Sequence, residues 1–368
     1  MCSAARKFGP RPVLASADRN LPITRVKGSS LRLGGSEFGV KTKIWLSAFV
    51  WHTRIVKGAR PSLACKIARR AKVGAALFRL GGLLHLPSTA IVRESAGDVP
   101  RIIWMYWHDG EDEAPEVARY CIDSWRKHNP DWDVRVLDSS SATDYVNIDY
   151  VPAGTRLQLV ADALRLELLN RYGGVWADAS CLCTAPLADW LINRLGEGFF
   201  AFERPGPDRP LGNWFLASLP GSPLVASWVE VSRLYWRNGY YSNHIGEAGR
   251  RDQFIYHYLF EWMINSNKQL RSEWQSVPTL PAEPHFMLQK CLRISLGMPS
   301  APLRGVTWPG AESGFEQLDQ AAIQLLTTNI VSSPDVRVHK LDWRLENALR
   351  ILRTSADADQ SVDHRDMP

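Results

Sequence analysis

Apolar residues recur with two different periods between residues 99 and 354, and these periods predict the elements of a folded domain. Residues 102–107 form an unbroken apolar run that is typical of a buried strand. Residues 116–128 follow a helical spacing, and residues 132–137 alternate between apolar and polar positions as a second strand does. A strand, a helix and a strand in this order predict a βαβ unit and a parallel sheet.

A second helix is predicted by apolar residues spaced from Leu157 to Leu168, and the glycine pair 173–174 supplies its stop signal. Residues 175–177 then form a short predicted strand, and Asp178 follows directly after it. Ligands of open α/β sheets bind beyond the carboxyl ends of the strands. We therefore expect Asp178 to lie at a binding site.

Asp162 and Arg165 are charged residues inside this otherwise apolar helix. Because they are three residues apart, both can face one ligand, or they can pair with each other on a solvated face. The helix is apolar around most of its circumference, which leaves little room for a solvated face.

The remaining pattern is less regular. It predicts a strand at 213–217, helices at 223–236 and 253–262, a proline-punctuated loop at 277–288, a strand-like segment within 330–339 and a terminal helix at 341–352.

Charge is divided unequally along the chain. Residues 1–95 contain 18 Lys and Arg against 3 Asp and Glu, whereas the remaining residues contain 26 against 35, so the net charge of +6 combines +15 with −9. This asymmetry predicts a polyanionic partner for the first part only. We expect a loose leader at 1–40, a basic amphipathic helical region at 41–98, the folded domain at 99–354 and a disordered tail at 355–368.

In residues 41–86, Lys and Arg interleave with Trp, Phe, Leu and Ile. A pair of basic amphipathic helices of this kind suits an anionic membrane surface. The alternative is a helical cap that packs on the folded domain and keeps its basic face in solvent. A nucleic-acid partner is not expected, because no recognised nucleic-acid motif accompanies the charge.

Cysteine usage and apolar runs predict the compartment. The six cysteines are scattered and form no disulfide framework, which indicates a reduced, intracellular setting. We find no secretory signal pattern near Met1 and no uninterrupted apolar run of roughly 18 residues that could span a bilayer. The prediction is a cytoplasmic protein, peripheral on the cytoplasmic face of a membrane.

Short motifs between residues 99 and about 345 follow one another in an order that resembles a known family. They are Ile102–Trp107 with Gly110, Ser124-Trp125, Asn129-Pro130, Ala161–Arg165, Tyr172–Ser180, Pro186-Leu187, Asn213–Phe215, Asp252–Phe254 with His257–Phe260, Ser276–Pro278 and His339–Trp343. Each is weak alone. The ordered set is similar to the capsular polysaccharide synthesis protein family, which is related to DXD-containing sugar transferases such as yeast initiating mannosyltransferases and clostridial glucosylating toxins.

The resemblance implies a fold and a chemistry. The expected fold is α/β, a GT-A-type Rossmann-like nucleotide-sugar transferase domain with a mixed, mainly parallel sheet and an N-terminal basic helical extension. The expected substrates are a UDP- or GDP-sugar donor and a glycan or lipid-linked acceptor, joined with retention of anomeric configuration. A divalent metal, Mn²⁺ or Mg²⁺, would neutralise the charge that develops on the diphosphate leaving group.

The metal-binding motif departs from the family's fuller form. Asp178-Ala179-Ser180 offers one carboxylate and one hydroxyl, where an Asp-x-Asp motif offers two carboxylates. Hard cations prefer several oxygen ligands. The resemblance therefore implies weaker metal binding or further ligands elsewhere, and we predict Asp178 and His339 as the metal ligands.

The resemblance also assigns roles to other residues. Trp107 would stack on the nucleotide base, Asp162 and Arg165 would hold sugar hydroxyls and phosphate, Lys340 would contact the phosphate, and Asp252 would lie on the acceptor side. The predicted donor-binding residues are Trp107, Asp162, Arg165, Tyr172, Asp178, Ser180, Asn213 and Lys340. The candidate catalytic residues are Asp178, Asn213 and Asp252.

The sequence thus predicts a glycosyltransferase that extends a capsular or other surface polysaccharide or a lipid-linked glycan. The lone carboxylate of the triplet at 178–180 keeps one alternative open, a transferase-like scaffold without catalysis in a polysaccharide assembly complex. Of the fifteen tryptophans, we expect Trp104, Trp125 and Trp176 in the core.

Overall fold

The computed structural model describes residues 99–195, 198–206, 209–237, 254–298, 320–345, 347 and 349–353. The predicted leader at 1–40, basic region at 41–98 and tail at 355–368 lie outside the described residues, as does Asp252. The expectations for them, and the domain boundaries, stay predictions.

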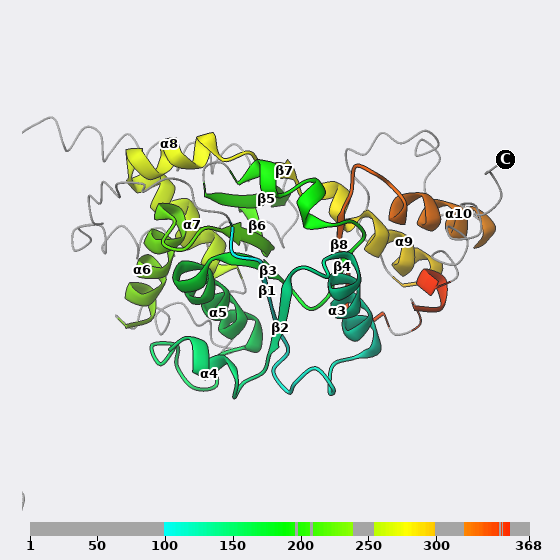
Figure 1. Cartoon of the computed structure of the whole chain (residues 1–368), viewed down its shortest axis with the longest axis horizontal. Helices are drawn as coiled ribbons and strands as arrows, with labels where there is room; N and C mark the ends of the chain where they lie inside the picture. The colour runs from blue at the N-terminus through cyan, green and yellow to red at the C-terminus, as the bar shows by residue number, and fades with distance from the viewer. Residues whose placement is uncertain are drawn as a thin grey trace, which may run out of the picture. The chain divides into compact units, whose positions relative to one another are not determined.

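A six-stranded sheet forms the centre of the described part, with the strand order β2-β1-β3-β6-β5-β7 (Figure 1). Strands β1, β2 and β3 are parallel, β6 runs antiparallel to both β3 and β5, and β7 is parallel to β5. The predicted α/β class with a mixed, mainly parallel sheet is confirmed. The bounds are β1 Ile102–Tyr106, β2 Asp133–Leu137, β3 Gly174–Ala177, β5 Phe199–Gly206, β6 Arg209–Ser218 and β7 Leu280–Pro281.

Helices cover both faces of this sheet. Their bounds are α3 Glu116–His128, α4 Ala142–Tyr145, α5 Leu157–Tyr172, α6 Pro223–Arg237, α7 Ile255–Ser266, α8 Lys268–Ser276, α9 Met287–Ser295 and α10 Gln320–Val331, with 3₁₀ turns at Leu187–Asp189, Ile192–Arg194 and Glu283–Phe286. Helices α5, α6 and α7 pack on one face, and α3 packs on the other. None of the helices in the described ranges is long and apolar enough to span a lipid bilayer.

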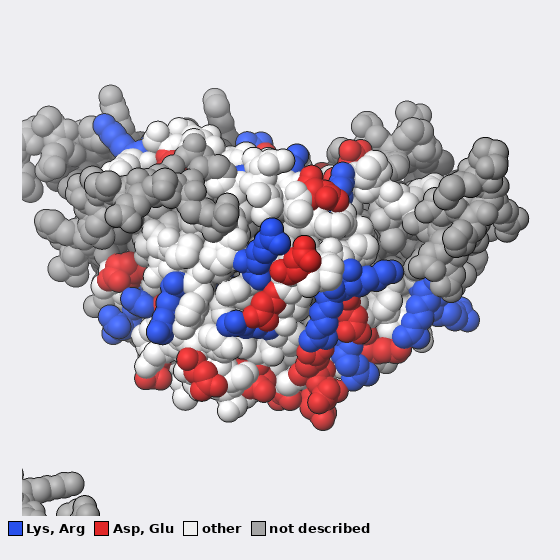
Figure 2. Space-filling view, in the orientation of Figure 1, with Lys and Arg blue, Asp and Glu red and all other residues white. Residues whose placement is uncertain are grey.

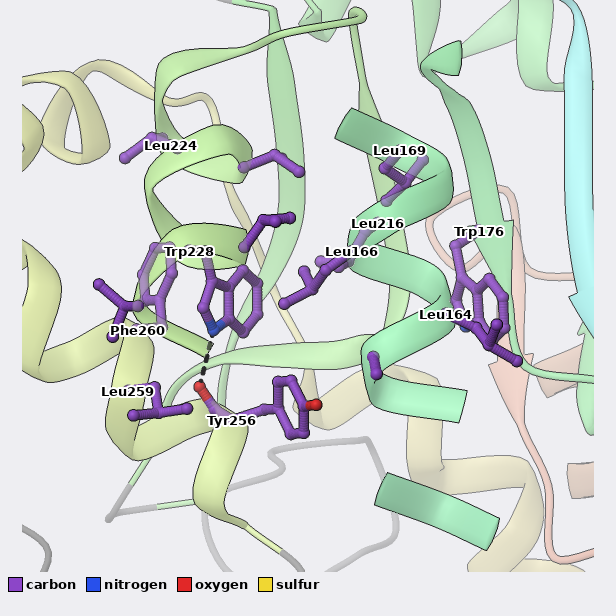
Figure 3. Packing of buried hydrophobic residues seen from close by; sticks show 14 of the residues in the cluster. Leu164, Leu166, Leu169, Trp176, Leu216, Leu224, Trp228, Tyr256, Leu259 and Phe260 are labelled. Atoms are coloured by element: carbon purple, nitrogen blue, oxygen red, sulfur yellow. Dashed lines mark hydrogen bonds between the residues drawn. The ribbon is translucent and has the colours of Figure 1, made fainter. Parts of the chain in front are cut away.

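The larger core lies between the sheet and α5, α6 and α7, where aliphatic side chains of α5 face aromatic side chains of α6 and α7 (Figure 3). The indole Nε1 of Trp228 donates a 3.0 Å hydrogen bond to the carbonyl oxygen of Tyr256, which ties α6 to α7. Buried tryptophans need such an acceptor for the indole N–H. Trp104, Trp125 and Trp176 are buried as predicted.

A separate two-stranded ribbon pairs β4 (Cys181–Cys183) with β8 (Val338–Lys340), segments more than 150 residues apart in the chain. Helix α3 holds β4 in place. Trp125 Nε1 donates to the Cys181 carbonyl oxygen at 2.7 Å, and the Cys183 N–H donates to Ser124 Oγ at 2.9 Å. The Ser-Trp motif of α3 therefore fixes the strand that directly follows Asp178.

Some predicted elements are longer, shorter or missing. The strand predicted at 213–217 is the second half of β6, and its partner β5 was not predicted. The segment at 277–288 contains β7, a 3₁₀ turn and the start of α9 instead of a loop. The segment at 330–339 forms a strand only from Val338, because α10 extends to Val331. Among the described residues of the predicted terminal helix at 341–352, those from 349 onward are helical and those at 341–345 and 347 are not.

The glycine pair between α5 and β3 is required by its surroundings. Gly173 has φ +66°, and a Cβ there would lie 2.6 Å from Pro220 Cδ. Gly174 has φ +89°, and a Cβ there would lie 2.6 Å from the Ile102 carbonyl oxygen. Only glycine allows this backbone conformation and the close approach of β1 at once.

We expect Gly173→Ala to lower the free energy of unfolding by about 2–4 kcal/mol, because strain at positive φ adds to the clash with Pro220. Gly154→Ala is the matched control, since Gly154 also has positive φ (+72°) but nothing within 4 Å of the added Cβ. It should cost only about 1 kcal/mol. Urea unfolding of both variants measures the difference, and equal losses would contradict the steric argument.

Candidate active site

Asp178 lies on the turn that joins β3 of the large sheet to β4 of the ribbon. Its N–H donates to the Trp214 carbonyl oxygen at 2.9 Å, and its own carbonyl oxygen accepts from the Cys181 N–H at 2.8 Å. The parallel pairing of β1 and β3 puts Asp178 level with Tyr106, at the carboxyl edge of the sheet. The backbone of this turn is therefore held on both sides.

Arg165 of α5 connects Asp178 to Asp162 beneath it. Arg165 Nη2 donates to Asp178 Oδ1 at 2.9 Å, and Nη1 lies 2.7 Å from Asp162 Oδ1. The side chains of Arg165 and Asp162 are only 5% and 7% exposed, whereas that of Asp178 is 27% exposed. The pair in α5 thus forms the floor of the site and Asp178 its accessible part.

Lys340 of β8 reaches the same carboxylate from the ribbon. Its Nζ donates to Asp178 Oδ2 at 2.8 Å and to Ser180 Oγ at 2.7 Å. The position of Lys340 is set by its pairing with Cys181 across the ribbon and by the 2.9 Å hydrogen bond from the Leu341 N–H to the Ser180 carbonyl oxygen. Its side chain is 19% exposed.

Asn213 of β6 completes the cluster, because its Nδ2 donates to Asp162 Oδ1 at 2.8 Å. The structure therefore brings together six residues that the sequence proposed for the donor site: Asp162, Arg165, Asp178, Ser180, Asn213 and Lys340. They come from α5, the β3–β4 turn, β6 and β8, and they form one connected polar chain.

Trp176 belongs to this cluster as well, although the sequence placed it only in the core. Its Nε1 donates to Asp178 Oδ1 at 3.0 Å, and the Arg165 guanidinium lies 5.0 Å from the centre of its ring. The signal that could have found it is the two-residue period of a strand, which puts Trp176 and Asp178 on the same face.

Burial and charge act in opposite directions on these groups. Burial by itself would raise the pKa of Asp178, but Lys340 and Arg165 together hold that pKa below its ordinary value. Burial would lower the pKa of Lys340, but Asp178 and its neighbours raise it. For Asp162, burial dominates over Arg165 and raises its pKa to about 7. Asp178 and Lys340 are thus charged at neutral pH, and Asp162 titrates near neutrality.

His339 does not join the cluster. Adjacent residues of a strand point to opposite faces, so the imidazole of His339 lies on the face of the ribbon opposite Lys340 and Asp178. It is fully buried, neither ring nitrogen has a hydrogen-bond partner among the described residues, and burial lowers its pKa to about 3. The structure thus does not bring the two predicted metal ligands, Asp178 and His339, together.

Tyr172 is also away from the cluster. It lies at the last turn of α5, about 10 Å along the helix axis from Arg165. Its hydroxyl donates to the Tyr145 carbonyl oxygen at 3.1 Å, and its ring packs against Trp104. In this structure it is part of an aromatic cluster at the amino end of β3.

Trp107, the predicted base-stacking residue, is partly exposed just past the end of β1. Its ring meets Trp343 edge-on at a centroid distance of 5.6 Å. On the other face of the same strand end, a pocket of about 310 Å³ is lined by Tyr106, His108 and Asp149, with Leu164 of α5. The volume is at the lower end of the range for small-molecule sites.

The predicted divalent metal does not fit the donor set that the structure describes. Both oxygens of Asp178 are already engaged by Arg165, Trp176 and Lys340. Within the described ranges, no three His, Cys, Asp or Glu side chains are placed to hold a metal ion. Mn²⁺ and Mg²⁺ need several oxygen ligands, and the Lys340 ammonium, which cannot act as a ligand, stands against the one carboxylate available.

A known protein family matches the part of the chain that contains most of the ordered motifs. The family model described as capsular polysaccharide synthesis protein matches residues 89–295, which is more than half of the chain. The chain belongs to this family. The match contains the turn with Asp178, all of α5 and the motifs of α3 that anchor β4.

Curated relatives of this capsular polysaccharide synthesis family protein are named as glycosyltransferases. The O-glycosyltransferase braB of Annulohypoxylon truncatum is 31% identical over 36% of the chain and 37% of its own length. The probable glycosyltransferase FCK3 of Fusarium pseudograminearum is 24% identical over 66% of the chain and 70% of its own length. The chain thus spans only about two fifths of the length of the first of these relatives.

Solved structures that match this chain include two glycosyltransferases. The PaToxG glycosyltransferase has 15% identity and a TM-score of 0.32, over 71% of this chain and 97% of its own. The galactosyltransferase LgtC, in complex with donor and acceptor sugar analogues, has 14% identity and a TM-score of 0.35, over 70% of this chain and 95% of its own.

The raised pKa of Asp162 makes the stability of the fold depend on pH. The folded state holds the Asp162 proton more tightly than the unfolded chain does. The contribution of this protonated carboxyl group to the free energy of unfolding is therefore complete below pH 3.8 and is lost as the pH rises to about 7. Relative to Asp162→Asn, the wild type should lose about 1.4 kcal/mol per pH unit in that window. Urea unfolding between these pH values measures it, and parallel profiles for the two proteins would contradict the assignment.

Proposed function

We propose that the protein is a nucleotide-sugar-dependent glycosyltransferase with the cluster of Asp162, Arg165, Asp178 and Lys340 as its donor site. The observation that carries this proposal is a partly exposed carboxylate held by two cations at the carboxyl end of β3. This is the edge of an α/β sheet at which nucleotide ligands bind. The names of the curated relatives support the same reaction class.

The reaction needs what these side chains offer. The bond between the anomeric carbon and the terminal phosphate oxygen breaks, and its electron pair stays on the diphosphate. The acceptor hydroxyl oxygen forms the new bond to the anomeric carbon, and its proton passes to the departing phosphate. The guanidinium of Arg165 and the ammonium of Lys340 would stabilise the charge on that phosphate. Asp162 and Asn213 would bind the hydroxyls of the sugar.

The pocket beside Tyr106 and His108 would hold the nucleoside. It lies at the same edge of the sheet as Asp178, since β1 and β3 are parallel and in register. His108 Nδ1 and the Tyr106 hydroxyl are 2.9 Å apart, and Asp149 also lines the pocket, so polar groups are available for a ribose or a base. Stacking of the base on Trp107, on the other face of the end of β1, is the alternative placement of the nucleoside.

The acceptor would be a surface polysaccharide or a lipid-linked glycan, and the sugar would be transferred with retention of configuration. The description of the family supports a polysaccharide product. The basic residues before position 96 support contact with an anionic membrane on the cytoplasmic side, where a lipid-linked acceptor would lie. Asp252 remains the predicted acceptor-side residue.

A panel of UDP- and GDP-sugars tests the donor proposal. We expect the full chain to bind or hydrolyse at least one of them. Asp178→Asn should lower the rate by about 10²–10³-fold, because Arg165 and Lys340 lose the carboxylate that holds them in position. Asp189→Asn is the control, since Asp189 is exposed in a 3₁₀ turn. Equal activity of the two variants, or no binding of any nucleotide sugar, would contradict the proposal.

A vesicle assay tests the membrane proposal. The full chain should sediment with vesicles rich in phosphatidylserine and stay in solution with neutral vesicles, because each Lys or Arg near an anionic surface contributes about 1 kcal/mol. Replacing Lys41, Lys43 and Lys57 by Glu should weaken sedimentation. Binding that does not change with lipid charge or with salt would contradict the proposal.

A further inference from the structure

The ammonium group of Lys340 contacts the side chains of both Asp178 and Ser180. Its Nζ lies 2.8 Å from Asp178 Oδ2 and 2.7 Å from Ser180 Oγ. Asp178 and Ser180 have the spacing of an Asp-x-Asp motif, whose two side chains point to one metal ion. In this chain, the ammonium group of the Lys340 side chain thus lies where an Asp-x-Asp motif would hold a metal ion.

The ammonium is fixed by the fold and not only by its ion pair. Lys340 is paired with Cys181 in the ribbon, β4 is anchored to α3 by Trp125, and the Leu341 N–H binds the Ser180 carbonyl oxygen. A lysine held on both sides loses less conformational freedom when it binds a ligand than a free surface lysine would. The site is thus pre-organised around a single positive charge.

The cluster keeps a donor for an anion. Arg165 and Lys340 share Asp178, Arg165 also pairs with Asp162, and Arg165 Nε is buried without a hydrogen-bond partner among the described residues. Over the described part of the face in Figure 2, Lys and Arg side chains are interleaved with Asp and Glu, so the field there comes from local pairs. An anionic ligand would gain most of its attraction from these two cations.

We infer that Lys340, supported by Arg165, is the resident cation of the donor site and holds the diphosphate of the donor without a divalent metal. The inference rests on the proposed function, because it concerns the same site and the same class of ligand. An ammonium binds phosphate as a point charge and donates up to three hydrogen bonds. Lys340 can therefore keep its bonds to Asp178 and Ser180 and still donate one to a phosphate oxygen.

Titration of the full chain with UDP and with GDP tests the inference without any turnover. Calorimetry is run once with EDTA and once with Mn²⁺. We expect at least one nucleotide to bind the wild type with the same Kd in both buffers. Lys340→Met should weaken that binding about 10–100-fold in both, which is the usual worth of a charge-assisted hydrogen bond. The corresponding monophosphate, UMP or GMP, which lacks the β-phosphate, should distinguish the variants less.

Two further variants separate a local effect from loss of the fold. Lys290→Met is the matched control, since the Lys290 side chain is 18% exposed against 19% for Lys340 and has its own carboxylate, Glu283, at 3.9 Å. It should bind as the wild type does. Lys340→Arg keeps the positive charge and should restore most of the affinity. Melting temperatures of all variants show whether each one is folded.

Three outcomes would decide against the inference in different ways. Binding of the wild type only with Mn²⁺, with unchanged affinity in Lys340→Met, overturns the inference and leaves the proposed function standing. If Lys290→Met and Lys340→Met weaken nucleotide binding equally, Lys340 contributes only to the overall charge of the protein, and the inference is also overturned. Failure of the folded wild type to bind either nucleotide in either buffer removes the proposed function together with the inference.

Discussion

The carboxylate of Asp178 is the point at which the separate parts of the fold meet. It accepts from Arg165 of α5, from Trp176 of β3 and from Lys340 of β8. A partly buried carboxylate is stable only when its charge and its lone pairs are matched, and here three different elements provide the match, one of them, β8, 162 residues away in the chain. The pairing of β4 with β8 and the burial of α5 are both needed to bring those partners within hydrogen-bond distance.

Buried charge also explains why the surrounding scaffold is so rigidly specified. Helix α5 is buried around its whole circumference from Asp162 to Leu169, so its charged side chains must find partners inside the protein. Asp162 and Arg165 find them in the candidate site, and Glu167 pairs with Arg233 of α6 at 2.6 Å and with the hydroxyl of Tyr150. The same helix that forms the core therefore delivers the polar groups of the site, and neither could shift without exposing the other.

Most of the parallel half of the sheet and most of the site could be predicted from the sequence, because both depend on short, local patterns. The helix with Asp162 and Arg165, the glycine stop and the strand end at Asp178 are all within 17 residues of one another. What failed depends on distant pairing. The sequence could not show that β8 pairs with β4, and so could not say which of His339 and Lys340 faces Asp178. Strand β5 was missed because its apolar residues pair with β6 only in the folded sheet.

The division of charge along the chain has a consequence for how an anionic donor would be held. The residues after position 95 carry a net charge of −9, which by itself repels a diphosphate. A site inside such a body needs fixed cations close to the ligand, because at a Debye length of about 8 Å more distant charges are screened. Arg165 and Lys340 meet this need, since they are held against Asp178 before any ligand binds. A cation carried by a side chain of the ribbon, and not recruited from solution, would keep that local field whatever the supply of metal.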